Sequence, residues 1–67
     1  SEMLDKFKHA LFAGDSHFAR TLIDECYERG LVDMMYEMRM ILDDAIRTQQ
    51  AALLDVLGGS EAPPGSN

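Results

Sequence analysis

The 67-residue chain allows one small domain, and its 12 acidic and 6 basic residues give a formal net charge of −6. The basic residues never cluster, and this argues against a nucleic-acid partner because a phosphate-binding surface needs a concentrated basic face. The same charge disfavours an anionic membrane surface, and no apolar run approaches the roughly 20 residues that span a bilayer. We therefore expect no nucleic-acid partner and no membrane partner.

The first predicted helix spans about residues 3–12. Leu4, Phe7 and Leu11 recur at helical spacing on one face, the pattern of an amphipathic helix that buries one side. Gly14 follows, and glycine can take the left-handed conformation that closes a helix without a Cβ clash. We predict that this helix ends before Gly14.

The second predicted helix spans about residues 16–29, and Asp15 or Ser16 can cap its first turn. Its apolar stripe comprises Phe18, Ala19, Leu22, Ile23, Cys26 and Tyr27. Gly30 predicts the end of this helix, since glycine can take the left-handed conformation that closes one. The joint after the first helix is too short for anything but an antiparallel helical hairpin.

The third predicted helix spans residues 33–57, with Asp33 as its N-cap, and it carries an apolar heptad pattern. The heptad seam comprises Leu31, Met35, Met38, Leu42, Ala45, Gln49, Ala52 and Val56. Gln49 is its only polar member. Either Gln49 fixes the register of a helix pair, or it is exposed to solvent at the edge of the bundle. The pattern leaves open a break near Thr48. Two i, i+4 ion pairs are expected, Glu25 with Arg29 and Asp43 with Arg47.

The lengths of the three helices do not match. The third helix would be about 37 Å long, whereas the first two span roughly 15 to 22 Å each. We expect the uncovered half to form a self-association interface of Ala45, Ile46, Gln49, Ala52, Leu53, Val56 and Leu57. Two antiparallel copies would bury these side chains; another protein, or a further part of a longer chain, is the rival occupant.

The predicted fold class is therefore all-α: a helical hairpin followed by a long heptad-patterned helix, which forms a dimeric helical bundle. This module covers residues 1–58. Residues 59–67 contain two prolines and no apolar periodicity, and we interpret them as a disordered tail or linker.

Neither histidines nor the cysteine predict chemistry. His9 and His17 have no third ligand at metal-binding spacing, so we expect two solvent-facing histidines and no metal. Cys26 lies on an apolar stripe beside Glu25 and Glu28, a setting that favours an inert core thiol. We predict no catalytic residue and no cofactor. One unpaired cysteine is typical of a reducing compartment, so we expect the cytoplasm.

Tyr36 and Met40 lie one turn apart on the polar side of the third helix. An exposed aromatic and thioether pair rimmed by charge is a candidate contact point for a protein partner.

One family resemblance covers residues 10–31. The resemblance rests on Ala10-Leu11-Phe12-Ala13-Gly14-Asp15, Ala19, Leu22-Ile23, Glu25 and Gly30-Leu31. This stretch resembles the helical cap that precedes cobalamin-binding domains, which implies two helices joined at Gly-Asp and a third helix after a glycine. The Asp-x-His-x-x-Gly loop of that family, whose histidine can ligate cobalt, does not occur here. The resemblance therefore assigns no ligand in this chain.

The favoured function is a non-catalytic protein–protein interaction module, for homodimerisation or for docking as an adaptor. One alternative is a small acidic inhibitor that occupies a basic site on a target protein. The other alternative, implied by the resemblance, is the helical cap of a cobalamin-binding protein.

Overall fold

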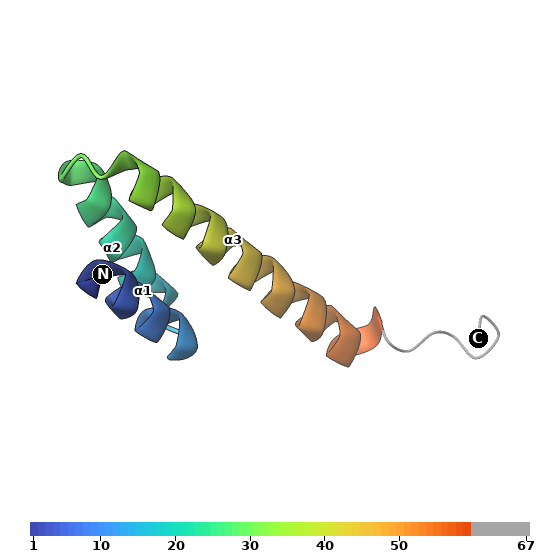
Figure 1. Cartoon of the computed structure of the whole chain (residues 1–67). Helices are drawn as coiled ribbons and strands as arrows, with labels where there is room; N and C mark the ends of the chain where they lie inside the picture. The colour runs from blue at the N-terminus through green and yellow to red at the C-terminus, as the bar shows by residue number, and fades with distance from the viewer. Residues whose placement is uncertain (60–67) are drawn as a thin grey trace.

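The computed structural model describes residues 1–59 as three α-helices followed by one π-helical turn, with no strand in that range. α1 (Glu2–Phe12) and α2 (Ser16–Glu28) form an antiparallel hairpin, and α3 (Val32–Leu54) continues into η1 (Asp55–Gly59). The hairpin lies along the first part of α3, whose later turns extend beyond it (Figure 1). The predicted helical hairpin followed by a long helix is confirmed. Apart from Gly59, the predicted tail lies outside the described residues.

Both joints between helices use a glycine in the left-handed region. Gly14 has φ 74° and Gly30 has φ 75°, a conformation that costs other residues about 1–2 kcal/mol. In each joint the residue after the glycine donates its N–H to a carbonyl of the helix that has ended, Asp15 to Ala10 at 2.8 Å and Leu31 to Cys26 at 2.8 Å. These bonds satisfy carbonyls that a helix end leaves unpaired. The predicted stops at both glycines are confirmed.

The two joints differ in how they start the next helix. The Asp15 carboxylate accepts a hydrogen bond from the Phe18 N–H at 2.9 Å and caps α2. α3 has Leu31 as its N-cap and no side-chain cap. The predicted Asp33 cap is therefore wrong. The turn that closes α2 places the Leu31 carbonyl where it accepts from the Met35 N–H at 2.9 Å, and Asp33 lies in the first turn, where the helix dipole favours negative charge.

The end of α3 also differs from the expectation. The helix runs unbroken through Thr48, but its α-helical part ends at Leu54 and not at residue 57. The π-helical turn of η1 follows, and Gly58 inside it is extended at φ 174°. Glycine is among the poorest helix formers, so the two glycines at 58 and 59 favour this unwinding. Val56 and Leu57 consequently lie on the π-helical turn.

The hydrophobic core fills the space between the hairpin and the first part of α3. Its buried members are Phe7, Ala10, Ala19, Leu22, Ile23, Cys26, Met35, Met38 and Leu42. Inside it, Cys26 Sγ lies 3.7 Å from Met38 Sδ, within range for a weak thiol donor and a thioether acceptor. No residue of α3 beyond Leu42 belongs to the buried core of the described chain. The core therefore stops about halfway along α3.

Candidate interaction surface

The heptad seam of α3 passes from the core into solvent along one helix. Met35, Met38 and Leu42 are buried. Further along, Leu53 is 55% exposed, and Val56 on η1 is 76% exposed. Leaving a large apolar side chain in water forgoes about 1.5–3 kcal/mol of possible burial. The second half of α3 therefore presents a face that the rest of residues 1–59 does not cover.

The structure places the seven residues of the predicted self-association interface in two groups. Ile46 is half-buried and packs against the hairpin core. The other six are exposed, namely Ala45, Gln49, Ala52, Leu53, Val56 and Leu57. We call Gln49, Ala52, Leu53, Val56 and Leu57 the distal face of α3, because they lie beyond the end of the core. Ala45 and Ile46 form its border with the hairpin.

A hollow of about 110 Å³ marks that border. Its walls are Leu11, Gly14 and Ser16 from the hairpin and Leu42, Ala45, Ile46 and Gln49 from α3. Gln49 is exposed and lies at its outer edge. The hairpin thus ends level with the turn of α3 that contains Gln49, and the distal face begins there.

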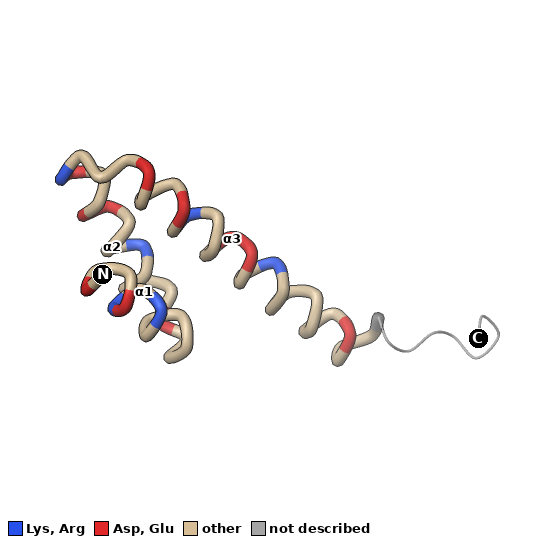
Figure 2. Tube along the Cα trace, viewed as in Figure 1, with Lys and Arg blue, Asp and Glu red and all other residues tan. Residues whose placement is uncertain are grey.

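Charge is sparse on this part of the chain. Between Arg47 and Asp55 the sequence contains no charged residue, and Figure 2 shows an uninterrupted neutral stretch there.

Arg47 pairs with Asp44, three residues earlier, so the predicted pair with Asp43 is wrong. The other predicted pair is confirmed, with Arg29 Nη1 at 3.3 Å from Glu25 Oε2.

A second apolar group lies on the opposite side of α3. Tyr36, Met40 and Leu54 fall within about 40° of one another around the helix, roughly opposite the seam. All three are more than half exposed. We call Tyr36 and Met40 the outer patch. Because the two surfaces face away from each other, occupation of the distal face would leave the outer patch accessible.

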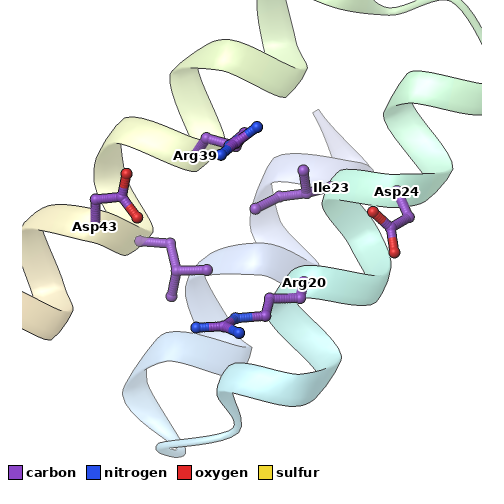
Figure 3. Close-up of a pocket in the computed structure, with 6 residues that line it drawn as sticks. Arg20, Ile23, Asp24, Arg39 and Asp43 are labelled. Atoms are coloured by element: carbon purple, nitrogen blue, oxygen red, sulfur yellow. The ribbon is translucent and has the colours of Figure 1, made fainter.

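A larger hollow, of about 390 Å³, lies between α2 and α3. Each helix contributes one arginine, one aspartate and one apolar side chain, namely Arg20, Ile23 and Asp24 from α2 and Arg39, Leu42 and Asp43 from α3. Figure 3 shows Arg20 and Arg39 extending into this space. The charges balance, and no cysteine or histidine lines the hollow. The sequence reasoning missed it, although the repeated arginine-x-x-x-aspartate spacing on two paired helices is a usable signal.

The two histidines and the cysteine do not form a metal-binding group in residues 1–59. His9 and His17 are exposed, and within residues 1–59 no group of three metal-ligating side chains comes together. Cys26 is fully buried, as predicted. Burial raises the pKa of its thiol, the Glu25 carboxylate raises it further, and Arg29 partly offsets both effects. These conditions disfavour the reactive thiolate.

Comparison with family models, with curated proteins and with solved structures found no match for this chain. The resemblance of residues 10–31 to a cobalamin-domain cap therefore stays a prediction. None of the helices in residues 1–59 combines the length and hydrophobicity needed to cross a bilayer.

Proposed function

We propose that this chain is a non-catalytic homodimerisation module that associates through the distal face of α3. One observation carries the proposal. The core buries Met35, Met38 and Leu42 in the first half of the heptad seam, whereas the second half is exposed. Leu53 beside it and Val56 at its end on η1 are both more than half exposed. Chains this short bury a smaller fraction of their unfolded surface than larger domains do, and they often gain stability from oligomerisation.

An antiparallel arrangement fits this surface best. The hairpin extends along α3 as far as the turn containing Gln49, so only the last turns of two α3 helices can approach closely. Antiparallel crossing places the two hairpins at opposite ends, where they do not collide. A parallel pair would hold both hairpins side by side and wedge the exposed seams apart. The crossing also pairs two neutral stretches, which limits repulsion between copies of an acidic chain.

Sedimentation velocity over a wide concentration range tests the dimer, with two neighbouring substitutions as a matched pair. Leu53 and Leu54 are 55% and 65% exposed on the same turn, but Leu53 belongs to the distal face and Leu54 lies on the opposite side. Leu53→Lys should shift the chain to a monomer, and Leu54→Lys should leave association unchanged. Lysine and leucine have similar helix propensities, so helicity should be preserved in both variants.

Three results would contradict the proposal. The first is a wild-type chain that stays monomeric at several hundred micromolar. The second is an equal weakening of association by the two lysine substitutions, and the third is an association that neither substitution weakens. Salt provides a further control. A dimer held by apolar contacts should respond little to ionic strength, whereas an acidic inhibitor bound to a basic site should release its target steeply as salt rises.

The outer patch supports a second role, docking of a different protein. Tyr36 and Met40 are both more than half exposed, and they face away from the distal face. Changing both to alanine should abolish capture of such a partner and leave helicity and dimerisation intact. Unchanged capture by the double variant in a pull-down would remove this role.

A further inference from the structure

Phe12 is the most exposed large apolar side chain of the described residues, at 90%. It is the last residue of α1. Single exposed apolar residues are common on protein surfaces and by themselves indicate nothing. The position of Phe12 relative to the distal face is the informative feature.

Phe12 adjoins the border between the hairpin and the distal face. With Lys8 and Leu11 it surrounds an open hollow of about 330 Å³. Leu11 also lines the hollow that contains Ala45 and Gln49 of α3. Leu11 therefore lines both hollows and connects the border of the distal face with Phe12 at the end of α1.

The antiparallel crossing would bring the end of a second copy to this place. The distal face extends from Gln49 to Leu57, a rise of about 12 Å. When two such stretches overlap fully, the two-fold axis passes near Leu53. Leu57 of the second copy then lies level with Gln49 of the first, beside the hollow that Gln49 shares with Leu11, the neighbour of Phe12. By symmetry, each copy contributes one phenylalanine and one helix end.

The buried area favours this contact. Complete burial of the exposed parts of the distal face would remove at most roughly 500 Å² per copy from water, or about 1,000 Å² for two copies, the lower limit for a specific interface. The Phe12 ring adds about 180 Å² per copy, which raises the total to roughly 1,350 Å². Only with the Phe12 rings does this upper limit reach the range of about 1,200–2,000 Å² that is usual for stable complexes.

We propose that Phe12 of each copy packs against Val56 and Leu57 of the second copy and closes both ends of the dimer. This inference rests on the proposed homodimer. The occupant is a second copy because the end of α3 that reaches Phe12 is apolar and contains one charged residue, Asp55, among positions 48–57. Each Phe12 thereby gains a partner that the described residues of its own chain do not supply.

The first test compares dimer dissociation constants by sedimentation equilibrium for the wild-type chain, Phe12→Ser and Tyr27→Ser. Tyr27 is a matched control, since it is an aromatic residue, 69% exposed, near the other end of the hairpin. Phe12→Ser removes two apolar contacts per dimer and should raise the dissociation constant by at least about tenfold, because two phenylalanine side chains would no longer be withdrawn from water on association. Tyr27→Ser should leave it unchanged. Circular dichroism checks that both variants stay helical.

The second test maps the contact. Chains with Phe12→Cys are mixed with chains with Leu57→Cys under mild oxidation, and the expected product is a disulfide between two different chains. The matched control mixes Tyr27→Cys with Leu57→Cys and should give no such product. Native Cys26 is fully buried and should not compete for the oxidant.

Failure of this inference can be distinguished from failure of the homodimer. A monomeric wild-type chain overturns both. A wild-type dimer that Phe12→Ser does not weaken overturns only the Phe12 contact. A weakened dimer that lacks the disulfide between positions 12 and 57 overturns it as well, because Phe12 would then support the dimer from another place.

Discussion

The two halves of α3 carry the same heptad pattern and have opposite surroundings. In the first half, Met35, Met38 and Leu42 are buried by the hairpin, whereas in the second half Ala52 and Leu53 are exposed. The pattern within a helix therefore defines which face is apolar, and the lengths of the neighbouring helices define how much of that face the chain can bury itself. Substitutions in the two halves should therefore have different effects on folding and on association.

The largest expected effect contrasts a core residue with a distal one. Phe7→Ala should lower the free energy of unfolding of the monomer by about 3–5 kcal/mol, because it empties a fully buried site. Leu57→Ala should change it by less than about 0.5 kcal/mol. Denaturant titration of each variant in the Leu53→Lys background, which should be monomeric, measures both. Similar losses in the two variants would mean that the monomer covers the distal face.

Gln49→Leu should strengthen association by about tenfold or more, since it replaces the only polar member of the seam with an apolar side chain that two copies can bury. Sedimentation equilibrium gives the change in dissociation constant. If the leucine only fills the hollow beside Leu11 and Ile46, the monomer will melt at a higher temperature while the dissociation constant stays the same.

Gly30→Ala should destabilise the chain by about 1 kcal/mol, because Gly30 has φ 75° and the joint holds the hairpin against α3. A Cβ there would meet no atom within 4 Å, so the cost comes from the backbone alone. Gly58→Ala is the matched control, since Gly58 is extended and also has open space around it. Thermal melts of the two variants should differ; equal destabilisation would contradict this account of the joint.

The smallest effect is a pH dependence from Cys26. Because burial raises the pKa of this thiol in the folded chain, the unfolded chain releases its proton at a lower pH. The free energy of unfolding should therefore be unaffected below about pH 8.5 and should fall as the pH rises above it. Denaturant titrations from pH 7 to 10 measure this slope. Cys26→Ala should reduce the slope, and an unchanged slope would assign it to other groups.

Local signals in the sequence were sufficient for much of the fold. Gly14 and Gly30 follow the ends of their helices as predicted, because glycine adopts the left-handed conformation that closes a helix without the steric penalty of a Cβ. The apolar stripe of α2 identified Cys26 as a core residue. The ion pair of Arg47 was not predictable, since Asp43 and Asp44 are both within reach on a helix. The cap of α3 was missed because the preceding turn, and not the side chain of Asp33, sets where the helix begins.

The sequence by itself determined three amphipathic helices, their order, and an excess of apolar side chains on the third, because these properties depend on spacing along the chain. Only the tertiary structure decided where the core ends. The hairpin stops level with Gln49, and that position depends on how α1 and α2 pack against α3. The same packing left Phe12 exposed beside the start of the distal face, because a side chain on the outer side of α1 points away from the core that its neighbours fill.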